Sequence, residues 1–216
     1  MLKILLLALI SGLTFSTSFA QSGAPHDMLI RFNFPGLIDF QDNNLSSGLE
    51  YKINQQWSTG ADVGWIFSSR YMARTKAANG LLFRPFIRLY PKENGKLFVE
   101  TELHYKKVTY KIEDWLGRSP VNGTPAYEEF TTFNYKKRAM GMHFRVGGVF
   151  DITKDGLLKL EMTGGIGFRY KEEYPVGGLY QSGRPFFLRG GDDNGGKIST
   201  SLPVFPFNLR LCYQVN

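Results

Sequence analysis

Residues 81–105 constrain the fold more than any other stretch; they read LLFRPFIRLYPKENGKLFVETELHY. Apolar and charged side chains alternate on both sides of the tight turn PKENGK. Successive side chains of a strand point to opposite faces, so this stretch predicts an antiparallel hairpin with one apolar and one charged face. Facing residues of such a pair share a face, so we expect Arg84 and Arg88 to lie near Glu100 and Glu102.

The same two-residue rhythm recurs along the chain. Strands are expected near 28–34, 45–54, 57–67, 81–90, 97–115, 134–152, 158–171 and 205–215. The links at 35–44, 68–80, 116–133 and 172–201 are long, and those at 54–56, 91–96 and 153–156 are short. Outer-membrane barrels have short periplasmic turns and longer external loops. The sequence therefore predicts an all-β, up-and-down antiparallel transmembrane β-barrel of about eight strands, with its apolar faces toward lipid.

The first twenty residues have the features of a secretory signal peptide. Lys3 is followed by an apolar run to Phe15 and by the small residue Ala20. That run is shorter than the roughly 20 residues of a spanning helix. We expect a cleaved signal at 1–20, one domain at 21–216 and a bacterial outer-membrane location. The expected partners are outer-membrane lipid and the barrel-assembly machinery. The net charge of +7 is dispersed along an exported chain, so nucleic acid is not an expected partner.

The charged faces are predicted to line the barrel interior. An eight-strand barrel is only wide enough for side chains to fill it. Unpaired charges away from water cost several kcal/mol each, so we expect a paired, hydrated network and no wide pore. The predicted interior set is Arg31, Glu50, Lys52, Asp62, Arg84, Arg88, Glu100, Glu102, His104, His143, Arg145, Glu161, Arg169 and Arg210, with Asp151 and Lys159 on the same faces.

Outward aromatic residues are expected to mark the two rims of the apolar band. Trp57 and Trp65 are eight residues apart on one face, which separates them by about 20 Å in height on a tilted strand. The predicted aromatic girdle is Trp57, Trp65, Tyr90, Phe150, Tyr170 and Tyr213. Cys212, the single cysteine, makes no internal disulfide and is expected to be buried on the last strand.

No catalytic motif accompanies this pattern. His104 and His143 share the inward face with carboxylates, but the chain has no H-x-x-x-H, H-E-x-x-H or G-x-S-x-G. The sequence GDDNGGK at 191–197 has P-loop spacing, yet Ile198 stands where Ser or Thr is required. We predict that the protein is not an enzyme and has no catalytic residue, metal or cofactor.

The segments IRFNF, GLEYKINQQWSTGADVGW and RPFIRLYP, between Arg31 and Tyr105, carry a family resemblance. They resemble a domain-of-unknown-function family of small bacterial outer-membrane β-barrels. The plan of the whole chain is similar to that of OmpA- and OmpX-type eight-strand barrels. The resemblance implies an integral outer-membrane location and no particular activity. The chain departs from such barrels by ending on Asn216 instead of an aromatic residue.

The expected role is structural, adhesive or surface-binding, with any extracellular ligand or protein contacting the long loops at 116–133 and 172–201. Two alternatives fit the same alternation. A soluble, exported lipocalin-like carrier would turn its apolar faces inward around a cavity. An outer-membrane lipid-modifying enzyme would use His104 and His143.

Overall fold

The computed structural model describes residues 28–38, 42–72, 74–92, 95–119, 121–122, 125–176 and 197–215. Most of these residues lie in strands of one antiparallel sheet. Within this part of the chain, no helix is long and apolar enough to cross a membrane. The expected signal peptide at 1–20 and the GDDNGG stretch at 191–196 lie outside the described residues.

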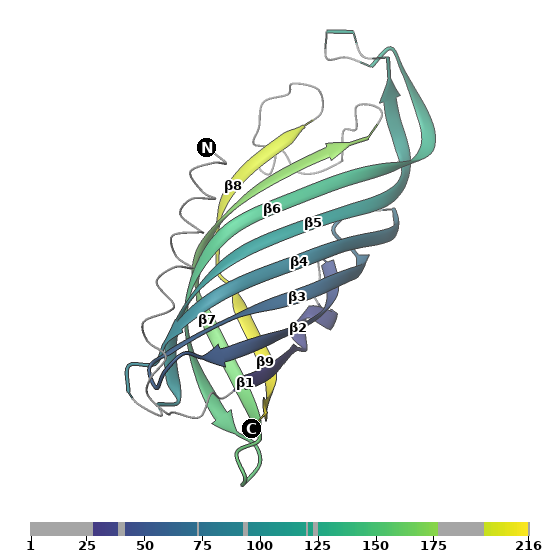
Figure 1. The fold of residues 1–216 in the computed structure, drawn as a ribbon. Helices are drawn as coiled ribbons and strands as arrows, with labels where there is room; N and C mark the ends of the chain where they lie inside the picture. Colours follow the sequence, from purple (N-terminus) through teal and green to yellow (C-terminus); the bar gives the residue numbers. More distant parts are fainter. Residues whose placement is uncertain are drawn as a thin grey trace.

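The sheet closes on itself as a ring (Figure 1). Each strand from β1 to β7 pairs with the next, and β9 pairs with both β7 and β1. A short 3-10 helix, η2 (Pro35–Ile38), follows β1. The strands are β1 (Met28–Asn33), β2 (Asp42–Lys52), β3 (Trp57–Ser69), β4 (Thr75–Leu89), β5 (Leu97–Arg118), β6 (Tyr127–Asp151), β7 (Leu158–Pro175), β8 (Ile198–Val204) and β9 (Phe207–Val215).

In the described residues the sheet has nine strands where about eight were predicted, because β8 forms at the end of the link expected at 172–201, ahead of the last predicted strand at 205–215. Phe205 and Pro206 separate β8 from β9. Proline has no backbone N–H, so it interrupts a hydrogen-bonded ladder. Both strands pair with β7: β9 lies along 158–164 and β8 along 167–173. β1 ends at Asn33 and pairs with β9, not with β8. In the described residues β8 therefore has a neighbouring strand on one side only, and the ring is uneven there.

Several strands are longer than predicted, and the links are correspondingly shorter. The loop expected at 116–133 is mostly strand, because β5 and β6 stay paired as far as Arg118 and Tyr127. Trp115 and Phe130 pack edge-to-face there, with ring centroids 5.5 Å apart. The link expected at 172–201 likewise loses its ends to β7 and β8. Backbone pairing and aromatic contacts extend these polar segments, which lack a clear apolar alternation.

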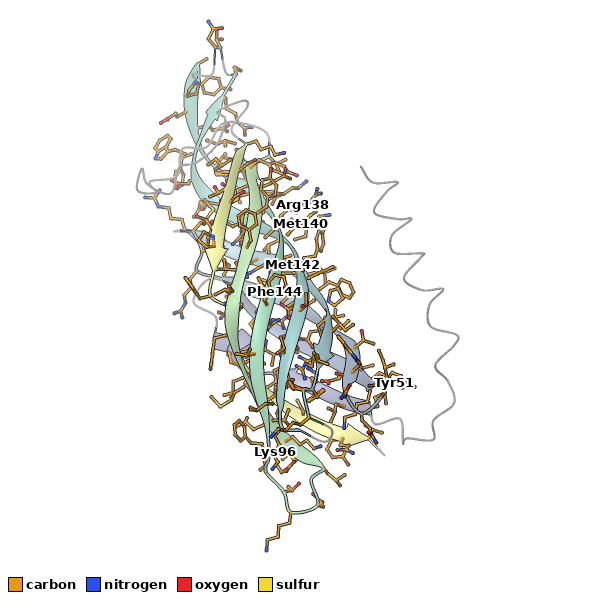
Figure 2. All side chains as sticks on the ribbon, turned by 90° about the vertical axis from the view of Figure 1, so that its left-hand side faces the viewer. Tyr51, Lys96, Arg138, Met140, Met142 and Phe144 are labelled. Carbon is orange, nitrogen blue, oxygen red and sulfur yellow. The ribbon has the colours of Figure 1, made fainter. Side chains whose placement is uncertain are left out.

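The two faces of the ring differ sharply in character. Met140, Met142 and Phe144 follow one another along the outer face of β6 (Figure 2), and between 41% and 50% of each side chain is exposed. His143 and Arg145 alternate with them and are at most 2% exposed. The other strands repeat this arrangement, so the apolar face points outward and the charged face points inward.

The interior also contains an apolar region that the alternation did not predict. It lies toward the end of β3 at Ser69 and the start of β4 at Thr75. Tyr110 and Tyr135 contribute rings with centroids 6.5 Å apart. The buried members of this apolar cluster are Ile66, Met72, Ala78, Val108, Tyr110, Ile112, Leu116, Phe133 and Tyr135.

Candidate functional site

Arg88 lies at the centre of a buried ion-pair core inside the ring. Its Nε is 2.6 Å from Glu100 Oε2, its Nη1 is 2.6 Å from Glu50 Oε2 and its Nη2 is 2.7 Å from Glu161 Oε1. These carboxylates come from β5, β2 and β7, so one guanidinium connects four strands. Guanidinium–carboxylate bonds of this kind are the stronger protein hydrogen bonds. Arg88 also lies over the Phe98 ring, 4.0 Å from its centroid.

Three further arginines share the same carboxylates. Arg210 contacts Glu161, and its Nη2 lies 3.1 Å from Asp62 Oδ2. Arg31 Nη2 lies 3.5 Å from Glu161 Oε1. Arg145 Nε lies 3.2 Å from Glu100 Oε1, and its Nη2 contacts Glu102. Each of these arginines is at most 1% exposed, so the network crosses the interior of the ring.

Buried charges of the two signs balance across the described residues. The buried acids are Asp42, Glu50, Asp62, Glu100, Glu102, Glu161 and Glu173, and the buried bases are Arg31, Arg84, Arg88, Lys106, Lys137, Arg145 and Arg210. A buried charge is tolerated when it is paired and hydrogen-bonded. Seven acids against seven bases leave this set without net charge.

Most of the predicted interior residues do lie together in this network. Four of the predicted residues are less buried. Lys52 and Lys159 are half-buried, and Asp151 is exposed with Oδ2 2.9 Å from Lys96 Nζ. Arg169 is half-buried beside His143.

The expectation for the hairpin of β4 and β5 is only half met. Arg88 faces and contacts Glu100. Arg84 instead turns toward β2 and β3, with its Nη2 3.5 Å from Asp62 Oδ2 and 3.3 Å from Ser46 Oγ. Asp62 is the residue that faces Arg84 on β3, so the neighbouring strand provides the nearer carboxylate.

Tyr90 is a correction to the predicted aromatic girdle. Its side chain is buried, and its hydroxyl donates a hydrogen bond to Glu50 Oε1 at 3.0 Å. Tyr90 follows Arg88 by two positions and therefore shares the inward face. The other five predicted members, Trp57, Trp65, Phe150, Tyr170 and Tyr213, are between 38% and 55% exposed on the outer face.

A second ion cluster around Asp42 was not predicted. Asp42 Oδ2 lies 2.6 Å from Lys106 Nζ and 3.1 Å from Lys137 Nζ. Its Oδ1 accepts hydrogen bonds from the hydroxyls of Tyr110 and Ser69, at 2.8 and 2.7 Å. The position of Lys106, two residues after His104 on the inward face, is the sequence signal for it. Asp42 itself was hidden in the predicted link 35–44.

Two cavities lie on either side of the ion-pair core. One, of about 320 Å³, lies toward the 91–96 turn and is lined by Leu29, Tyr90 and Lys159. The other, of about 600 Å³, is lined by Asn33 and His104. Arg31 lies between Leu29 and Asn33 along β1 and is 1% exposed, as part of the core that separates the cavities.

The larger cavity contains a cluster of Glu102, His104 and His143. His143 Nδ1 lies 3.0 Å from Glu102 Oε1, and the two imidazole centroids are 5.2 Å apart. Among the described residues, neither ring nitrogen of His104 has a hydrogen-bond partner, although the residue is only 7% exposed. One potential ligand atom from each of the three lies within 4.8 Å of the others.

The surroundings of this cluster fit neither a divalent cation nor a nucleophile well. Arg145 contacts Glu102, Arg210 Nη2 is 3.6 Å from Glu102 Oε2, and Arg169 Nη2 is 3.4 Å from His143 Nε2. These cations would repel a metal ion. A His–carboxylate pair activates a serine or cysteine only when that group is within hydrogen-bond reach. In the described residues, His143 hydrogen-bonds to Glu102 and Arg169 instead.

Comparison with known proteins gives no match: a scan of protein-family models, a search of curated proteins and a search of solved structures each find none. The family resemblance of residues 31–105 therefore stays a prediction.

Proposed function

We propose that the protein is an integral outer-membrane β-barrel that is closed to solute flow and has a structural, adhesive or ligand-contacting role at the cell surface. The observation that carries this proposal is the inside-out distribution of polarity around the ring. Apolar side chains such as Phe83, Val99 and Phe144 are between 44% and 50% exposed, whereas Arg88 and Glu100 are fully buried. Soluble monomers rarely expose apolar patches larger than a few hundred Å².

The extent of the outer apolar face supports a membrane-spanning band. On β6 this face runs over residues 140–150 and gives way to exposed Arg138. On β5 it gives way to Lys107 and Lys111. A transmembrane β-strand needs about 9–11 residues, which is the length of the apolar part of β6. The remainder of β5 and β6 would extend beyond the lipid.

The buried ion-pair core favours an interior that blocks the passage of solutes over one that forms an open pore. Arg31, Arg88, Arg145 and Arg210 lie between the two cavities and are at most 1% exposed. The same core weighs against the lipocalin-like alternative, because a lipocalin-like carrier needs an apolar interior. In the proposed barrel, any ligand contacts the outer loops or the larger cavity and does not pass through.

Membrane fractionation and heat-modifiability on a gel test the location and the fold together. We expect the protein in the outer-membrane fraction, with an unheated form that migrates differently from the boiled form. In planar bilayers, the purified protein should give no stable conductance steps. A mature chain that stays dispersed in buffer without detergent would contradict the membrane proposal. A steady ohmic conductance would contradict the closed interior alone.

The contact between Glu102 and His143 is the one observation that favours the alternative of a lipid-modifying enzyme. We propose that this contact is structural. Expression of His143→Ala and His104→Ala variants in the native host, followed by mass spectrometry of outer-membrane lipids, tests the point. The lipid profile should match that of the unaltered protein. Loss of one acyl or headgroup modification in both variants would establish the enzyme instead.

A further inference from the structure

The larger cavity carries an inference beyond the proposed barrel. It has a volume of about 600 Å³ and a lining of two kinds. Arg84, His104, Lys106 and Arg169 give it a cationic and hydrogen-bonding side, and Glu102, the one carboxylate of the lining among the described residues, contacts Arg145. Leu82, Phe205 and Phe207 give it an apolar side. A cavity of this size is within the usual range for a small-molecule site.

The polar side has buried donors whose hydrogen bonds are unmet. Arg84 is 6% exposed, its Nε has no hydrogen-bond partner in the part of the chain that the structure describes, and its Nη2 contacts are long, at 3.3 Å to Ser46 and 3.5 Å to Asp62. His104 is 7% exposed, and no described residue hydrogen-bonds to either of its ring nitrogens. Buried polar groups are nearly always hydrogen-bonded, so two such groups on one cavity indicate a missing acceptor.

The charge balance indicates the sign of that acceptor. The buried acids and bases cancel, seven against seven. Arg169, half-buried at the cavity, adds one positive charge to this balanced set. A singly charged anion at the cavity would offset the charge of Arg169, whereas a metal cation would add to it.

The apolar side connects the cavity to the outer surface of the ring. Phe205 lies in the break between β8 and β9, Phe207 begins β9, and the two residues are 81% and 61% exposed. In the described part of the chain, β7 is the only strand that pairs with β8. Leu82, buried on β4, continues the apolar lining inside. An alkyl chain could therefore lie across the break between β8 and β9, with the polar group at its end inside the cavity.

We propose that this cavity binds an anionic amphiphile with a single alkyl chain. Its carboxylate or phosphate accepts hydrogen bonds from Arg84 and His104, and its chain lies along Phe205 and Phe207. The site itself depends only on the cavity. Entry from the lipid phase, in contrast, rests on the proposed membrane location.

Equilibrium dialysis of radiolabelled decanoate tests the site, with the full-length mature protein held in an amphipathic polymer. We expect about one decanoate per protein. Unlabelled decyl phosphate should displace it, and decanol should compete at least tenfold less well. Arg84→Gln should weaken binding at least tenfold, and Leu82→Trp, which fills the cavity, should abolish it. Arg138→Gln, the same change on the outer face of β6, should leave binding unchanged.

Each other outcome has a defined meaning. Equal binding by the Arg84→Gln and unaltered proteins, both heat-modifiable and so folded, would overturn the proposal, as would equal competition by decanol. Acetate or inorganic phosphate competing as well as decanoate would overturn the alkyl part and support a free anion as the ligand. One equivalent of Zn²⁺ bound, lost in His104→Ala, with no decanoate bound would reassign the cavity to a metal. Decanoate binding by a protein that fractionates as soluble would overturn the membrane proposal and leave the site standing.

Discussion

Arg88 Nε lies 2.6 Å from Glu100 Oε2, across facing positions of β4 and β5, and neither side chain is exposed. The same guanidinium also contacts Glu50 and Glu161. Removing one member of a buried ion pair leaves its partners charged and desolvated, which costs more than the pair itself contributes. The interior of the ring is therefore most sensitive at Arg88.

Replacing Arg88 with Met should lower the free energy of unfolding by about 3–5 kcal/mol, because three carboxylates lose their central partner. Urea titration of the protein in lipid vesicles, followed by tryptophan fluorescence, measures the change. Lys96→Met is the matched control, because Lys96 pairs with Asp151 where both are largely exposed. Exposed pairs contribute little, so the control midpoint should not move. Equal effects of the two substitutions would show that the core is not the stabilising element.

Gly165 and Gly164 are adjacent on β7 but have different surroundings. A Cβ at Gly165 would meet the Phe144 carbonyl oxygen and lie 2.7 Å from Arg145 Cα, whereas one at Gly164 would meet nothing within 4 Å. Overpacking of this kind costs about 1–3 kcal/mol. Gly165→Ala should therefore lower the urea midpoint, and Gly164→Ala should leave it unchanged or raise it. Equal tolerance of the two alanines would contradict the close approach of β6 and β7.

Cys212 should be unreactive in the folded protein. It is 1% exposed, and its Sγ lies 3.8 Å from Glu161 Oε2 inside the ring. Burial next to a carboxylate disfavours the reactive thiolate. A charged maleimide should label less than a tenth of the folded protein within an hour and all of it after denaturation. Rapid labelling before denaturation would mean that water reaches the ion-pair core.

Asp155, in the turn between β6 and β7, should titrate at low pH. Its carboxylate accepts hydrogen bonds from the Thr153 hydroxyl and the Leu157 N–H, which hold its pKa below the ordinary value of 3.8. The folded-state pKa lies below the unfolded one. The stabilisation is therefore present above the unfolded pKa and is lost as pH falls through the folded pKa. Carboxyl ¹³C NMR measures this directly, and a titration midpoint at or above 3.8 would contradict these bonds.

The sequence was sufficient for local relationships and insufficient for distant ones. Alternation placed Arg88 and Glu100 on one face, and the short turn between their strands made them facing residues. Arg88 also contacts Glu161, which lies 73 positions away in the sequence. That contact depends on the closure and stagger of the whole ring, which no local pattern specifies.

The missed features have separate causes. Asp42 lies in a polar stretch without apolar alternation, so its place in β2 comes from pairing with Ser69 on β3. β8 was assigned mostly to the link 172–201, and the last strand was predicted to begin at Phe205, which lies in the break before β9. Tyr90 was assigned to the aromatic girdle because of its residue type, although it follows Arg88 by two positions and therefore points inward with it. Where residue type and strand alternation disagreed, alternation gave the right side.

The central claim is that the apolar face of the ring contacts lipid and the charged face is sealed inside. Nitroxide labels at Met142, Phe144 and Arg145 of β6, placed one at a time in a Cys212→Ser background in lipid vesicles, test it most directly by EPR. Collisions with oxygen should be frequent at 142 and 144, collisions with a water-soluble nickel complex should be rare there, and both should be rare at 145. Frequent nickel collisions at 142 and 144 would contradict the account.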